Sequence, residues 1–92
     1  MGNEIRDLSH LASMQQLTWL ALERNEITDL TPLAQLQQLA QLTLGFNQIS
    51  DLAPLLELPN LRELYIQSNP LNSTALVDQI RTLEERGVVV VR

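Results

Sequence analysis

Residues 39–49 decide the fold, and they read Leu-Ala-Gln-Leu-Thr-Leu-Gly-Phe-Asn-Gln-Ile. The same spacing of leucine, asparagine and a second aliphatic residue occurs 22 residues earlier, in 17–27, and 22 residues later, in 61–71. A period of this length, kept over three copies, is typical of a solenoid whose coils stack and share one core. The sequence therefore predicts a repeat protein.

Each copy contains a short alternation of apolar and other residues, such as Leu42-Thr43-Leu44. Period-two alternation predicts a short strand with one buried face. An asparagine follows each strand, where its amide can bond backbone groups of the turn. Stacked at the repeat distance, these side chains are predicted to form a structural ladder of Asn3, Asn25, Asn47 and Asn69.

The segments between the strands begin with an aspartate followed by a proline, as in residues 29–33 and 51–55. An aspartate cap and an early proline favour a short 3₁₀ or helical turn. Strands on one side and tighter turns on the other curve the stack. The predicted fold class is a short α/β solenoid with its parallel sheet on the concave face.

These repeated residues resemble the leucine-rich repeat family, specifically the 22-residue bacterial type of internalin-like proteins and of Roco-type GTPase repeat domains. The resemblance covers residues 3–72. It implies a right-handed solenoid of parallel strands and a usual role in binding proteins.

The repeat pattern divides the chain into a partial repeat, three full repeats and a C-terminal cap. After residue 72 the apolar residues take helical spacing, and Gly87 is placed to end a helix in a left-handed conformation. A strand of valines follows, and the segment resembles the C-terminal cap of bacterial leucine-rich repeats. The expected units are repeats over 1–72 (partial repeat 1–6 and full repeats 7–28, 29–50 and 51–72) and a cap over 73–92, with a helix at about 74–86 and a strand at about 88–91.

No comparable cap precedes the first coil, so Leu11, Leu17, Leu20 and Leu22 are expected to be partly uncovered. Solenoids need polar terminal repeats to remain soluble. The sequence therefore favours either a fragment of a longer solenoid or a homodimer formed through this N-terminal face.

Outward-facing strand positions are the ones free to vary, and all three aromatic residues of the chain fall on them. Aromatic residues near arginine are enriched in protein interfaces because they combine large apolar area with few rotamers to restrict. We therefore expect a partner-binding concave face made of Trp19, Ala21, Glu23, Arg24, Gln41, Thr43, Phe46, Glu63, Tyr65 and Gln67.

Composition argues against several other classes of function. Six arginines, no lysine and eleven acids give a net charge of −5, which disfavours nucleic-acid binding. No apolar run reaches the roughly 20 residues of a membrane span. Residues 1–6 lack the basic end and apolar stretch of a signal peptide, which favours a soluble, cytoplasmic chain over a secreted one. One histidine and no cysteine give no catalytic constellation. Asp7, Asp29 and Asp51 are interpreted as turn caps rather than calcium ligands, so no metal or cofactor is expected.

The sequence thus predicts a non-catalytic module that binds a protein or peptide. Two alternatives stay open. One is an isolated or engineered repeat scaffold without a partner of its own. The other is the sensor part of a larger signalling protein, such as a Roco-type GTPase.

Overall fold

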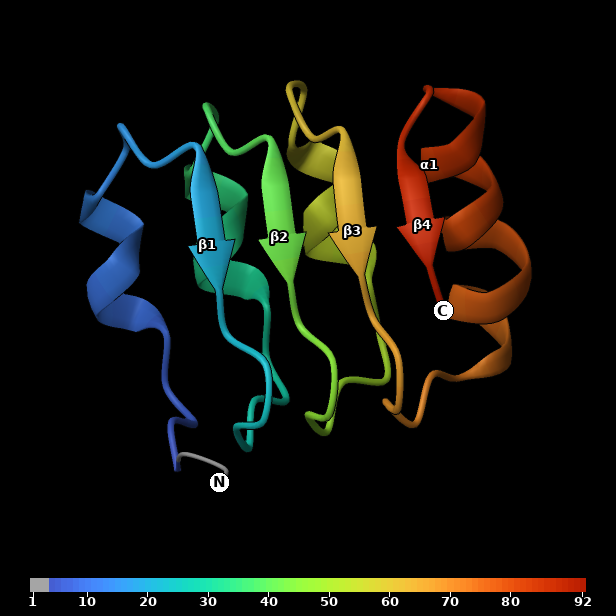
Figure 1. Cartoon of the computed structure of the whole chain (residues 1–92), viewed down its shortest axis with the longest axis horizontal. Helices are drawn as coiled ribbons and strands as arrows, with labels where there is room; N and C mark the ends of the chain where they lie inside the picture. Colours follow the sequence, from blue (N-terminus) through green and yellow to red (C-terminus); the bar gives the residue numbers. More distant parts are fainter. Residues whose placement is uncertain (1–3) are drawn as a thin grey trace.

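The computed structural model describes residues 4–92, so Asn3 of the predicted ladder lies outside the described residues. Four short parallel strands form one sheet in chain order (Figure 1). They are β1 (Trp19–Ala21), β2 (Gln41–Thr43), β3 (Glu63–Tyr65) and β4 (Val89–Val91). The predicted α/β solenoid is confirmed.

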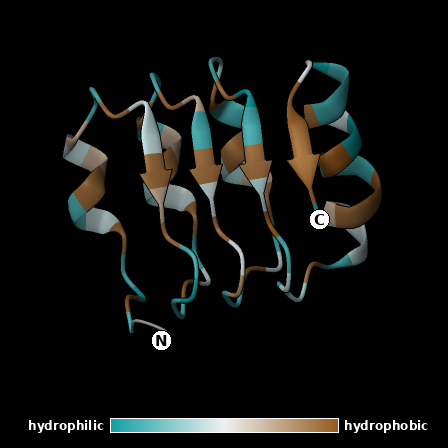
Figure 2. Cartoon of the chain, viewed as in Figure 1, coloured by the Kyte–Doolittle hydropathy of each residue, from teal (hydrophilic) through white to brown (hydrophobic). Residues whose placement is uncertain are grey.

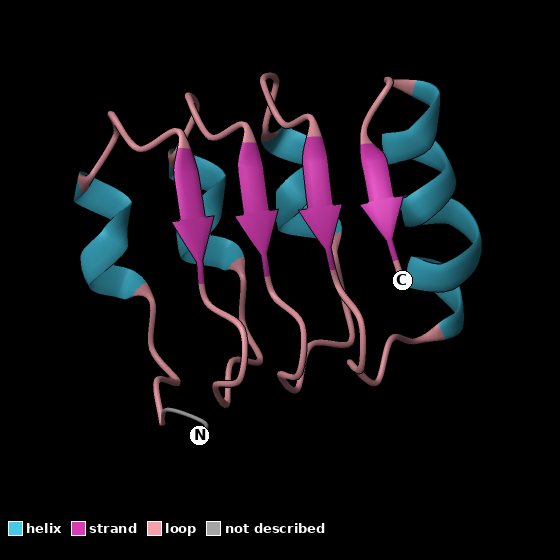
Figure 3. Ribbon diagram, viewed as in Figure 1, coloured by secondary structure: helices cyan, strands magenta, loops and turns pink. Residues whose placement is uncertain are grey.

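Three 3₁₀ helices lie behind the sheet, one in each coil (Figure 3): η1 (Ser9–Ser13), η2 (Thr31–Gln35) and η3 (Ala53–Glu57). Each begins with the same local hydrogen bond. The N–H of Thr31 donates to Asp29 Oδ1 at 2.9 Å, and the equivalent bonds join Ser9 to Asp7 and Ala53 to Asp51. The aspartate lies one residue before the N-cap position, which is a leucine in all three helices. Proline within the first turn then favours the tight helix.

Hydrogen bonding lowers the pKa of all three aspartates. The strongest contribution comes from the backbone of Ser9 for Asp7, from the side chain of Thr31 for Asp29, and from the side chain of Gln79 for Asp51. A carboxyl group whose pKa is lower in the folded state stabilises the fold above its unfolded pKa. That contribution is lost as the pH falls through the folded value.

The core is built from leucine columns that run through the stack. In the middle coil Leu36, Leu39, Leu42 and Leu44 are fully buried. In the first coil Leu11, Leu17 and Leu20 are only half-buried.

Leu22, which was expected to be partly uncovered like the other first-coil leucines, is buried. The segment before η1 closes that end of the coil. Ile5 donates its N–H to Asn25 Oδ1, and Glu26 donates its N–H to the carbonyl of Ile5.

The asparagine that follows each strand links neighbouring coils. Asn47 Oδ1 accepts the N–H of Ile27 at 3.1 Å, and Asn47 Nδ2 donates to the carbonyls of Leu22 and Leu44 at 3.0 and 2.9 Å. Asn69 makes the equivalent bonds one coil later. One buried amide therefore satisfies backbone groups of two coils.

One continuous helical run over residues 73–85 covers the last coil, in the region where a helix was expected at about 74–86. Within it a π-helical stretch, η4 (Ala75–Gln79), is followed by α1 (Ile80–Glu85). The side chain of Gln79 is buried between the helix and the third coil, where its Oε1 accepts the N–H of Leu52 and its Nε2 donates to Asp51 Oδ1. Gly87, with φ of 92°, then turns the chain into β4. Within residues 4–92 no helix has both the length and the apolar character needed to cross a membrane.

Candidate functional site

The exposed face of the sheet consists of two columns of side chains in register. Trp19, Gln41, Glu63 and Val89 form one column, and Ala21, Thr43, Tyr65 and Val91 form the other. The residues between them, such as Leu42, point into the core. Both columns therefore extend to β4.

Val89 and Val91 belong to this face but were not predicted to do so. Unlike β2 and β3, β4 is hydrophobic along its length (Figure 2), and Val89 is 60% exposed. Val89 pairs with Glu63, but the two residues are separated in the sequence by more than one repeat length because the cap helices lie between them. The 22-residue alignment could not therefore place these valines on the binding face.

Just beyond the strands, the chain adopts a left-handed conformation at the same position of every coil. The φ angles are 63° at Arg24, 61° at Phe46 and 58° at Ser68. Non-glycine residues adopt this conformation at a cost of roughly 1–2 kcal/mol. Here the Arg24 N–H donates to the carbonyl of Gly45 at 2.9 Å, and the Phe46 N–H donates to that of Gln67 at 2.8 Å. The arrangement also stacks the Arg24 guanidinium over the Phe46 ring, 4.5 Å from its centre.

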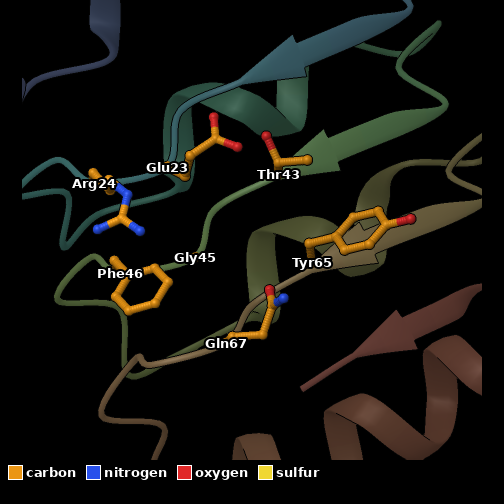
Figure 4. A pocket seen from close by; sticks show the side chains of 7 residues that line it. All are labelled: Glu23, Arg24, Thr43, Gly45, Phe46, Tyr65 and Gln67. Atoms are coloured by element: carbon orange, nitrogen blue, oxygen red, sulfur yellow. The ribbon is translucent and has the colours of Figure 1, made fainter. Parts of the chain in front are cut away.

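These side chains surround a pocket of about 260 Å³ at the ends of β1, β2 and β3 (Figure 4). Six of the ten predicted binding residues line it. The other four lie on the same face outside the pocket, where Gln41 donates a hydrogen bond to Glu63 and Trp19 is 57% exposed. The lining residues are Glu23, Arg24, Thr43, Gly45, Phe46, Tyr65 and Gln67.

Gly45 lines this pocket without contributing a side chain to it. The corresponding residues in the neighbouring coils are Glu23 and Gln67, so only the middle coil lacks a side chain there. A Cβ atom at Gly45 would lie 3.4 Å from both Gln67 O and Gln67 Oε1, which is ordinary contact. Glycine at this position of the repeat therefore leaves its part of the pocket lining without a side chain.

The hydroxyl of Thr43 is buried in the pocket lining without a hydrogen-bond partner. Thr43 Oγ1 is the only such side-chain atom among residues 4–92. A buried hydroxyl without a partner costs about 1–3 kcal/mol. Such unbonded polar atoms are rare in native structures. A group bound in the pocket that bonds to this hydroxyl would explain it.

We expect Thr43→Val to raise the free energy of unfolding by about 1 kcal/mol, because valine keeps the β-branched shape and removes the unbonded hydroxyl. Urea unfolding followed by circular dichroism measures the change. Thr18→Val, at an exposed position just before β1, is the matched control and should change little. A loss of stability in the Thr43 variant would show that the hydroxyl is bonded in solution.

The carboxylates and the histidine that the structure describes outside the pocket do not gather into a second site. Among residues 4–92 no three His, Cys, Asp or Glu side chains gather as metal ligands. Asp7, Asp29 and Asp51 are each engaged in the turn that follows them. His10 lies exposed in η1, on the side of the solenoid opposite the sheet.

The chain was compared with protein families. The model described as "Leucine Rich repeats (2 copies)" matches residues 15–57 and 37–79. No curated protein sequence matches the chain significantly.

Among solved structures, internalin C2 from Listeria monocytogenes is similar over 98% of the chain, with 35% identity and a TM-score of 0.84. Internalin InlF from the same organism is similar over 97%, with 27% identity and a TM-score of 0.81. The chain spans 38% and 25% of the lengths of these two internalin chains. The Chaetomium Mex67:Mtr2 structure, at 21% identity and a TM-score of 0.60, shares the fold.

Proposed function

Because this chain belongs to the leucine-rich repeat family, we propose that its concave face binds a protein or peptide and performs no catalysis. The pocket floored by Gly45 carries the proposal. It is the place where the exposed face is hollowed, and aromatic side chains from two coils border it. The internalin-like fold supports the same role, since this family's usual function is to bind proteins.

The pocket is suited to one partner side chain with both apolar and polar atoms. Phe46 and Tyr65 supply apolar surface, while Glu23 and Gln67 supply hydrogen-bonding groups at the edges. The Arg24 guanidinium is held against Phe46, so less entropy is lost when it contacts a partner. We propose these residues as the centre of the interface.

Trp19 and Val89 would extend the contact along the sheet. Both are large, exposed apolar residues in the same column, at opposite edges of the sheet. Exposed apolar residues gathered on one face mark interaction surfaces. An extended segment lying across the strands would contact both of them and place one side chain in the pocket.

Gly45→Gln tests the proposal. Glutamine occupies the equivalent position of the next coil, at Gln67, so the fold accommodates it. Its side chain should fill the pocket and weaken binding at least tenfold. Peptides that bind the natural chain are first selected from a displayed library. They are then titrated into each variant, and the fluorescence of Trp19 reports binding.

Ala53→Gln introduces the same side chain at an exposed position of η3 and is the matched control. It should bind the selected peptides as the natural chain does. If Gly45→Gln also binds them with unchanged affinity, the pocket is not the binding site.

A further inference from the structure

A second hollow, of about 240 Å³, lies on the rim of the solenoid, where the chain enters β3 and β4. Its lining is mainly polar and comes from the third coil and from the end of α1. It shares no residue with the concave pocket. The residues that line it are Pro59, Asn60, Leu61, Arg62, Arg86 and Gly87.

Hydrogen bonds fix the frame of this hollow. Arg86 Nη1 donates to the carbonyl of Leu56 at 2.6 Å, which orients the guanidinium. The carbonyl of Arg62 accepts the N–H of Val89 at 2.8 Å, and Asn60 Nδ2 donates to the carbonyl of Gln37 at 2.9 Å. Both arginines therefore extend from backbone that is held in place.

The two arginines of the hollow lack a counter-charge. Arg6 and Arg92 pair with glutamates, and Arg24 stacks on Phe46. In the part of the chain that the structure describes, Arg62 and Arg86 make no ion pair, and no carboxylate lines the hollow. Because both arginines line the same hollow, their positive charges repel each other, and an anion bound in the hollow would attract both.

We propose that Arg62 and Arg86 bind a phosphate-type dianion, either inorganic phosphate or a phosphate monoester. One dianion neutralises both guanidinium groups, whereas a carboxylate neutralises only one. Guanidinium groups form strong, paired hydrogen bonds with such oxyanions. Because the hollow lies on the rim, this site is independent of the partner-binding face.

The test is a titration of the ¹⁵N-labelled chain with inorganic phosphate at about pH 7.5, above the second phosphate pKa of roughly 6 for a monoester. Sodium chloride keeps the ionic strength constant, and the amide signals of Gly87 and Leu61 are followed. We expect saturable shifts at these amides. Parallel titrations with O-phosphoserine and acetate compare a monoester with a carboxylate, and whichever phosphate probe saturates at the lower concentration identifies the preferred source.

Arg62→Gln and Arg86→Gln should each weaken phosphate binding at least tenfold, because each removes a charge-assisted hydrogen bond. Arg81→Gln, at an exposed position of α1 outside the hollow, is the control and should bind as the natural chain does. Since Arg86 also bonds to Leu56, thermal unfolding of that variant checks the cap, and Arg62→Gln carries the test alone if the cap loosens.

Three results would overturn the proposal. The shifts could fail to saturate, Arg62→Gln could bind as tightly as Arg81→Gln, or acetate could saturate the same amides as readily as phosphate.

Discussion

Leu42→Ala is expected to lower the free energy of unfolding by about 2–5 kcal/mol, the range for a buried leucine whose removal leaves a cavity. Leu42 is fully buried in β2, an interior strand of the sheet, with Leu20 and Leu64 beside it in register. A coil flanked on both sides collapses little around a missing side chain. Urea unfolding followed by circular dichroism measures the loss.

Leu20→Ala makes the same change in the first strand, where the leucine is only half-buried. It should cost clearly less, because part of that side chain already contacts water. Equal losses for the two variants would mean that the leucines of the first coil are covered in solution.

Asn47→Ala is expected to cost about 2–4 kcal/mol, although it removes a polar side chain. The substitution leaves the buried N–H of Ile27 without an acceptor, at about 1–3 kcal/mol. It also removes two donated bonds of about 1 kcal/mol each, to Leu22 and Leu44, and a longer one to the carbonyl of Gly45 at 3.4 Å. The carbonyls of Leu22 and Leu44 keep a second donor from Asn25 and Asn69, which limits the total.

Asn25→Ala is the matched control at the end of the ladder. Asn25 donates only to its own coil, at Leu22 and Glu23, and accepts one N–H from Ile5 at 3.2 Å. Its loss should cost less than that of Asn47, measured by the same unfolding curves. If both variants unfold at the same urea concentration with the same slope, the hydrogen bonds between coils do not account for the stability that the asparagine ladder provides.

Most of the fold could be predicted because the repeat specifies it several times. Leucine columns, aspartates and asparagines each recur at 22 residues, so the same physical requirement appears in every coil. The cap occurs once, and its details were predicted less well. A helix was expected at about 74–86, but nothing in the apolar spacing indicated that it contains a π-helical stretch at Ala75–Gln79 or that Gln79 is hydrogen-bonded beneath it.

The exposed face was predictable from strand alternation, but the pocket was not. Alternation indicates which side chains point outward. The hollow is lined in addition by Gly45, which is not among the ten predicted binding residues, and by the left-handed residues Arg24 and Phe46 just beyond the strands. The left-handed conformation of Arg24 and Phe46 could not be predicted from their residue types, because glycine or asparagine usually adopts it. The binding role of these residues and the homodimer through the first coil stay predictions.

The bonds of Gln79 restrict how a protein of this kind can change length. The cap helix is attached to the third coil through the backbone of Leu52 and the carboxylate of Asp51. Every repeat begins with the same Asp-Leu pair, at residues 7–8, 29–30 and 51–52. A whole repeat inserted before the cap would therefore bring an aspartate and a leucine N–H to the same place beneath Gln79 and lengthen the sheet by one strand. An insertion of any other length between Asp51 and Gln79 would separate the glutamine from both groups, so this protein can change length only in whole repeats there.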